Sequence, residues 1–251
     1  MKRSILVAAL CVIPSFAFAQ AEPKGWVDVN VGVASSGQDE FTSAFGGLLF
    51  GEPAALAAAY PQPSRGADFD YGGGFMFTPV WGLGVSVTGT AHEDRAGLAL
   101  TVPHPYIFNA SATAADVTAD ALQRAETAVH VQVAAVPLWS NRFTLRVFGG
   151  PSYFRVTQDT VEDISFSQTA FPFSRVNIVT ITGFQGTELE GTGWGYHAGA
   201  DVGVFFTRVV GVGGMFRFSH GSVEVFDPLA GLNHDLEAGG VQVGGGLRLR
   251  F

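Results

Sequence analysis

His220, Ser222 and Glu224 stand at alternate positions of one segment and are residue types that can perform hydrolysis together. A serine hydroxyl becomes a nucleophile when a histidine accepts its proton and a carboxylate orients that histidine. Alternate side chains of a strand share a face, so an extended segment would place the three groups on one side. A His-x-Ser pair is nevertheless common by chance in a chain of 251 residues, and we expect the chain not to be an enzyme.

Two short runs contain residue types that bind metal ions. They are His92-Glu93-Asp94 and His234-Asp235, but neither has the spacing of a four-ligand site. The sequence also lacks a Walker loop and a dinucleotide-binding fingerprint after a strand. We therefore interpret both runs as solvated loop residues and expect no metal site and no cofactor.

The elements that would carry these residues follow from a hydrophobic period of two. In the last segment Val241, Val243, Leu247, Leu249 and Phe251 share one parity, whereas Gln242, Arg248 and Arg250 share the other. The same alternation predicts eight strands, at residues 27–34, 67–77, 83–92, 127–136, 143–155, 193–206, 210–223 and 241–251. Residues 176–184 alternate as well, which we interpret as a barrel wall that continues beyond a membrane, with a ten-stranded barrel as the alternative.

Alternation alone does not distinguish a soluble sheet with an apolar inner face from a membrane barrel with an apolar outer face. The predicted connections alternate between short turns (78–82, 137–142 and 207–209) and long loops (35–66, 93–126, 156–192 and 224–237). Outer-membrane barrels have short periplasmic turns, long extracellular loops and an aromatic girdle at each interface. We assign to the girdles Tyr71, Phe77, Trp81, Trp139, Phe143, Tyr153 and Trp194. The prediction is an all-β fold, a closed antiparallel transmembrane β-barrel of eight strands, with a secreted soluble barrel of lipocalin type as the alternative.

Charged residues occupy the polar parity of several predicted strands and would face the lumen. We predict a network of Asp28, Arg146, Asp201, Arg217, Arg248 and Arg250. An eight-stranded barrel is only wide enough for side chains to fill it, and unpaired charge there is costly. We therefore expect hydrogen-bonded ion pairs that plug the lumen, with a narrow or gated ion path as the alternative.

Composition supports a membrane barrel over other classes. The chain is 47% hydrophobic and 14% charged, contains 33 glycines and has a net charge of −8. No apolar run after the first twenty residues is long enough for a spanning helix, and few basic residues are present for binding nucleic acid. Lys2 and Arg3, an apolar run and Ala17-Phe-Ala19 predict a signal peptide over residues 1–19, cleaved during export through the inner membrane, before a barrel domain over 20–251.

Four stretches in the second half of the chain carry a family resemblance. Phe148-Gly-Gly-Pro-Ser-Tyr153, Gly195-Tyr-His-Ala-Gly-Ala-Asp201, Phe216-Arg-Phe-Ser219 and Leu247-Arg-Leu-Arg-Phe251 resemble the eight-stranded outer-membrane β-barrels of the OmpA and OmpX type. The resemblance implies a place in a Gram-negative outer membrane. It also implies that Leu247, Leu249 and Phe251 form a terminal signal read by the barrel-assembly machinery.

Other resemblances supply the alternative functions. The apolar segment Ala44–Tyr60 is expected to form a short helix that could line a hydrophobic pocket, a feature in which the chain is similar to OmpW-type barrels. The His220-Gly-Ser222 pair is similar to that of lipid A deacylase barrels, although Val223 stands where those proteins have an asparagine. The leading hypothesis is a structural and surface-interaction barrel, ahead of a narrow porin or hydrophobic-solute transporter, with an enzyme third.

The expected partners follow from the predicted surface. They are outer-membrane lipid and lipopolysaccharide, the assembly machinery and divalent cations at the acidic loops, because carboxylates suit Ca²⁺ and Mg²⁺. No nucleic acid is expected.

Overall fold

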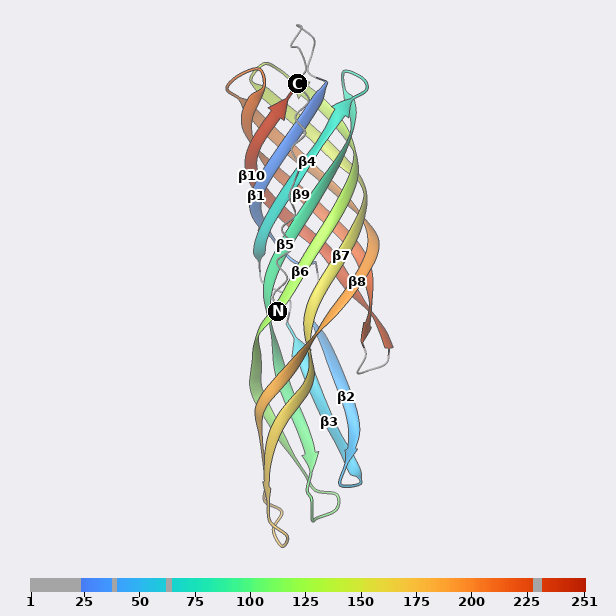
Figure 1. Cartoon of the computed structure of the whole chain (residues 1–251), viewed down its shortest axis with the longest axis vertical. Helices are drawn as coiled ribbons and strands as arrows, with labels where there is room; N and C mark the ends of the chain where they lie inside the picture. The colour runs from blue at the N-terminus through green and yellow to red at the C-terminus, as the bar shows by residue number, and fades with distance from the viewer. Residues whose placement is uncertain (1–23, 38–39, 62–64, 228–231) are drawn as a thin grey trace, which may run out of the picture.

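The computed structural model describes residues 24–37, 40–61, 65–227 and 232–251, which form ten strands of one antiparallel sheet (Figure 1). The strands are β1 (Gly25–Ala34), β2 (Phe41–Leu49), β3 (Glu52–Tyr60), β4 (Gly66–Met76), β5 (Trp81–Pro103), β6 (Ser111–Trp139), β7 (Phe143–Ala170), β8 (Asn177–Phe205), β9 (Val210–Asp227) and β10 (Leu232–Arg250). Among these residues there is no helix long and apolar enough to cross a membrane. The all-β antiparallel prediction is confirmed. The predicted signal peptide lies outside the described residues.

Eight of the ten strands are joined in an unbroken circle of pairings. β1 pairs with β4 and β10, and the remaining links run from β4 through β5, β6, β7, β8 and β9 to β10. One circuit of partners passes through Gly25, Phe75, Leu83, Val133, Gly149, Ala198, Phe218 and Val241. Val241 then accepts a 2.8 Å hydrogen bond from the backbone N–H of Ser35. The register thus advances by ten residues per circuit, which corresponds to a strand tilt of about 40°, within the range of closed barrels.

Glycines on the inner face make room for large side chains. Trp26 points inward and is buried, and a Cβ added at Gly74 would overlap its ring. A Cβ at Gly84 would lie 3.0 Å from the same ring. With Ala134, Phe148 and Met215, Trp26 forms one of three buried apolar clusters. The narrow interior therefore holds an indole because the neighbouring wall has no side chains there.

The four predicted long loops are mostly strand, so that prediction is wrong. β6 has 29 residues, β7 has 28 and β8 has 29, whereas about 10 span a membrane. Residues 177–184 form the start of β8 and, among the described pairings, pair with β7 alone, beyond the point where β8 also pairs with β9. They therefore belong to a hairpin that extends past the circle of strands. The buried side chains of these predicted loops include Leu98, Leu100, Val102, Val161 and Ile181, so the apolar face points inward there. This reverses the outward-apolar alternation by which we assigned strands.

The helix predicted over Ala44–Tyr60 is also wrong, because the segment forms the β2–β3 hairpin. Phe50 and Gly51 turn the chain with positive φ values of 56° and 80°. Five residues of β3, Ala55 to Ala59, pair with β5 outside the circle. This pairing, together with the Gly46-Gly47 break, overrides the helix propensity of the alanines. The described chain thus has two strands more than the predicted eight.

Candidate functional site

The predicted lumen residues lie inside the circle of strands because alternate positions point inward. Asp28, Arg146, Asp201 and Arg248 come from four strands and are all buried. Strand register makes two cross-strand pairs, with Asp28 opposite Arg248 and Arg146 opposite Asp201. The outward neighbours Val147 and Leu247 are exposed. The same alternation that predicted these positions thus delivers four charges to one level of the interior.

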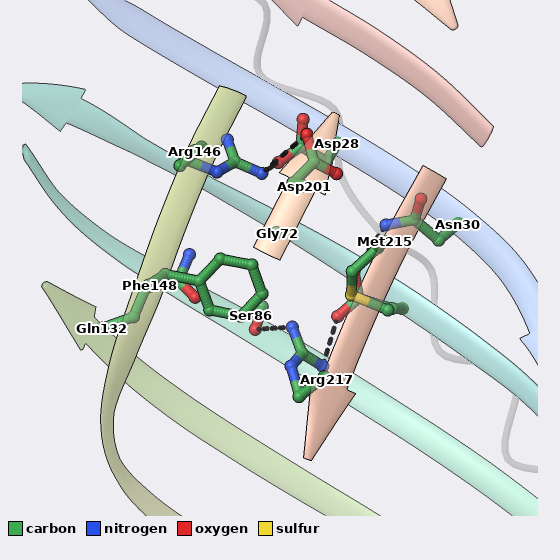
Figure 2. Close-up of a pocket in the computed structure, with 11 residues that line it drawn as sticks. Asp28, Asn30, Gly72, Ser86, Gln132, Arg146, Phe148, Asp201, Met215 and Arg217 are labelled. Carbon is green, nitrogen blue, oxygen red and sulfur yellow. Dashed lines mark hydrogen bonds and ion pairs between the residues drawn. The ribbon is translucent and has the colours of Figure 1, made fainter. Parts of the chain in front are cut away.

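Two arginines and two aspartates form the first cluster. Arg248 donates from Nε and Nη2 to Asp201 Oδ2, at 2.9 and 2.5 Å. Arg146 donates to Asp28, a pair visible in Figure 2. The crossed distances, Arg146 to Asp201 and Arg248 to Asp28, are both 3.6 Å. Each cation faces two anions and each anion two cations, so the group is neutral as a whole and offsets the desolvation of its members.

Arg217 is the centre of a second cluster farther from the chain ends. Its guanidinium donates to Asp70 at 2.8 Å and to Ser86 Oγ at 3.0 Å, as Figure 2 shows for Ser86. Asp70 also accepts a 2.8 Å hydrogen bond from Asn30. Asp70 and Ser86 were not assigned to the network from the sequence. The sequence offered one sign of Asp70's inward position, since it alternates with the apolar Phe69 and Tyr71. The run of glycines after Tyr71 hides this alternation.

Arg250 is buried like the others but contacts no carboxylate among the described residues. It donates to the backbone carbonyls of Arg208, Ser140 and Asn141 at 2.7 to 2.8 Å. Its guanidinium carbon lies 3.9 Å from the centroid of the Phe205 ring. Arg250 therefore fastens two of the short turns to the last strand and is separate from the charge network in which we predicted it.

A chain of hydroxyl and imidazole groups crosses the interior beside Arg217. Ser152 Oγ lies 2.7 Å from His130 Nδ1 and 3.0 Å from His197 Nδ1. His130 Nε2 lies 3.1 Å from Thr88 Oγ1. All four side chains are buried. These hydrogen bonds hold the two imidazole rings in fixed orientations.

Little empty space remains between the two clusters. The cavity there measures about 10 Å³, close to the minimum for one water molecule. Phe148 and Met215 line it, together with the charged groups (Figure 2). Two further lining atoms, Asn30 Oδ1 and Gln132 Oε1, have no hydrogen-bond partner within the described part of the chain.

The predicted girdle residues lie at two levels of the outer surface. Phe77, Trp81, Trp139 and Phe143 lie at the short turns, and all but the half-buried Trp139 are exposed. Tyr71, Tyr153 and Trp194 are exposed at the other level. The rings of Tyr153 and Trp194 are 5.1 Å apart in an edge arrangement. Between the levels the outward positions are apolar, and beyond them Arg155 pairs with Glu190 at 2.7 Å.

The predicted assembly signal ends the sheet. Leu247 and Phe251 are exposed and Leu249 is half-buried. The carbonyl oxygen of Phe251 accepts hydrogen bonds from the backbone N–H groups of Lys24 and Gly25, at 2.6 and 2.7 Å. The last residue is therefore hydrogen-bonded to the first strand of the circle.

A buried carboxyl group lies just beyond the level of Tyr153. Glu126 Oε1 accepts a 2.8 Å hydrogen bond from the N–H of Gly239, a residue with a positive φ of 96°. Arg124 Nη2 lies 3.7 Å from its other oxygen. Burial raises the pKa of Glu126 to about 7, and the nearby Arg124 opposes this shift. The carboxyl group is therefore partly protonated near neutral pH.

The residues considered for chemistry are not assembled as a catalytic group. Ser222 and Glu224 are exposed on the outer face and His220 is half-buried. His220 packs against Tyr196, with 5.8 Å between the ring centroids, and the described contacts contain no hydrogen bond from Ser222 to His220. Glu224 accepts a 2.5 Å hydrogen bond from Asn233. The described residues also contain no group of three or more side chains placed to hold a metal ion.

Comparison with known proteins identifies the family. The family model for the outer membrane protein beta-barrel domain matches residues 4–251. The chain belongs to this outer-membrane β-barrel family. The family is one of Gram-negative outer-membrane proteins, which gives the location. No curated protein sequence matches the chain.

Solved outer-membrane proteins resemble the chain at low identity. OprG of Pseudomonas aeruginosa is 9% identical, with a TM-score of 0.48 over 92% of this chain and 98% of that one. Neisserial surface protein A is 11% identical, with a TM-score of 0.42 over 90% and 97%. The Escherichia coli outer membrane protease OmpT is 10% identical, with a TM-score of 0.44 over 91% and 97%.

Proposed function

We propose that the protein is an eight-stranded transmembrane barrel with a lumen plugged by its own side chains and a structural and surface-interaction role. The observation that carries this proposal is the pair of charge clusters around a cavity of only about 10 Å³. The β2–β3 hairpin lies outside the circle and would belong to the extracellular part.

The height of the apolar band supports the transmembrane assignment. Ten residue steps separate Phe143 from Tyr153 on β7, about 33 Å of strand at ~3.3 Å per residue. A tilt of about 40° reduces this to roughly 25 Å, the height of the apolar band in outer-membrane barrels. The short turns and both described chain ends then lie on the periplasmic side, where cleavage of the signal peptide would leave the N-terminus.

The contents of the interior favour a plug over a pore. Charges in the first cluster are mutually neutralised, and Arg217 is held by Asp70 and Ser86. Phe148 and Met215 line the cavity between the clusters and pack in one apolar cluster with Trp26. An ion would have to displace both the apolar layer and the paired charges, which is costly in a narrow low-dielectric space.

Planar-bilayer recording of the purified full chain tests the proposal. We expect no large, stable conductance from the wild type, and none from a matched variant that removes the exposed Arg155–Glu190 pair, Arg155→Ser/Glu190→Ser. Removing one ion pair from each cluster together with the apolar side chain between them, in Asp28→Ser/Arg146→Ser/Asp70→Ser/Arg217→Ser/Phe148→Ala, should widen the interior and produce conductance steps. Large, stable steps from the wild type would overturn the plugged lumen, and reduced solute uptake by a deletion strain would point to transport.

A further inference from the structure

Three turns lie at the end of the molecule farthest from Phe251 (Figure 1), and their apolar side chains are exposed. They are the β2–β3, β5–β6 and β7–β8 turns. We define the distal tip as Leu48, Phe50, Tyr106, Phe108, Phe171 and Phe173. Each is more than half exposed, and Phe173 is completely exposed. Six large apolar side chains in water at one end of a protein mark an interaction surface.

Hydrogen bonds between the turns hold the distal tip together. Glu52, after the first turn, accepts a 2.6 Å hydrogen bond from the N–H of Asn109 in the second. His104 Nε2 in the second turn donates to the carbonyl oxygen of Ser174 in the third, at 3.0 Å. Gln168 donates to the carbonyl oxygen of Pro103 at 2.9 Å. Because the turns are linked, the apolar side chains are presented together instead of folding back separately.

The strands continue beyond the circle, and we call this part the extension. The charge of the distal tip differs from that of the rest of the extension. The turn sequences 48–51, 104–110 and 171–176 contain no aspartate or glutamate, and Glu52 next to the first turn is buried against Asn109. The exposed charged side chain of the turns is Arg175. Exposed carboxylates such as Glu162, Asp163 and Asp120 lie nearer the barrel. The surface that projects farthest is therefore apolar, with one exposed cation, on a protein that is acidic overall.

The distal tip cannot reach the bilayer that holds the barrel. From Tyr153, at the outer girdle, β7 runs seventeen further residues to Ala170, roughly 40 Å along the axis at the same rise and tilt. This step rests on the membrane placement given under the proposed function. A lipid surface contacted by the distal tip would thus belong to another membrane.

We propose that the distal tip docks on the surface of an apposed lipid bilayer with anionic headgroups. Aromatic and leucine side chains partition individually into a membrane interface, which needs no matching groove. The three turns end at separate points (Figure 1), a shape that suits a soft surface better than a flat protein partner. Arg175 complements anionic headgroups, and the exposed carboxylates lie farther from the contact, while Glu52 is buried.

Vesicle co-flotation tests the proposal with the full chain embedded in nanodiscs, so that the barrel's own apolar band is already covered. We expect wild-type nanodiscs to float with vesicles of phosphatidylcholine and phosphatidylglycerol, and empty nanodiscs to stay behind. The variant Phe50→Ser/Phe108→Ser/Phe173→Ser should lose about tenfold or more in binding, given the apolar area removed. Phe226→Ser, which replaces an aromatic on β9 about as exposed as Phe50, is the control and should bind as the wild type does.

The outcomes separate the two proposals. Equal binding by the triple variant and the control, or no binding by wild type, would overturn the lipid assignment. Association of wild-type nanodiscs without vesicles, lost in the triple variant, would assign the distal tip to a second copy of the chain instead. Failure to enter nanodiscs as a folded barrel, seen as loss of heat-modifiable gel migration, would overturn the membrane placement itself.

Discussion

Asp201→Asn should destabilise the barrel more than any neutralisation on its outer surface. Asp201 accepts from both Nε and Nη2 of Arg248 and lies 3.6 Å from Arg146. The substitution keeps the shape but leaves two guanidinium groups to share the single carboxylate of Asp28. Breaking a buried ion pair on one side costs about 3–5 kcal/mol. Since Asp28 still faces both cations, we expect roughly 2–4 kcal/mol.

Unfolding in urea, followed by heat-modifiable migration in detergent, measures this loss. The matched control is Glu190→Gln, whose partner Arg155 is exposed, and its cost should stay below about 1 kcal/mol. The double variant Asp201→Asn/Arg248→Met removes both charges and should recover much of the stability, because no cation is then left unpaired. An Asp201→Asn variant as stable as Glu190→Gln, or a double variant worse than the sum of its singles, would refute the reasoning.

Two other predictions concern the wall. Because burial raises the pKa of Glu126 to about 7, the folded state favours its neutral form. The contribution of Glu126 to the free energy of unfolding is therefore fully present below pH ~4.5. It is lost as the pH rises from there through about 7. Urea midpoints at pH 5 and pH 8 should differ less in Glu126→Gln, which can still accept from Gly239, and an unchanged difference would contradict this. Gly74→Ala should lower the free energy of unfolding by about 1–3 kcal/mol, because the new methyl group meets the Trp26 ring. Gly89→Ala, which has open space around it, should change it by less than about 0.5 kcal/mol. Equal unfolding midpoints for the two variants would disprove the clash.

The inner and outer faces were predictable wherever a strand contrasts polar with apolar residues. Asp28, Arg146 and Asp201 stand out as charges in otherwise apolar strands. Their pairing was not predictable, because Arg146 and Asp28 are 118 positions apart and meet only through the register of the complete circle. Between 156 and 192 the apolar side chains Val161 and Ile181 point inward, the reverse of the barrel strands, so most of that stretch looked like loop. Arg250 shows a further limit, since its parity is inward but its partners are backbone carbonyls that no sequence pattern marks.

Charge is arranged in zones along the axis of the molecule. Inside the barrel Arg146 and Arg248 balance Asp28 and Asp201, so the interior contributes little to the net charge of −8. The excess acid therefore lies mainly on the exposed extension, where salt screens it strongly, whereas the buried clusters are screened much less. Raising the ionic strength should thus alter what the extension binds while leaving barrel stability almost unchanged. If the proposed function holds, the contacts with the surroundings would be made by the acidic extension and its apolar end.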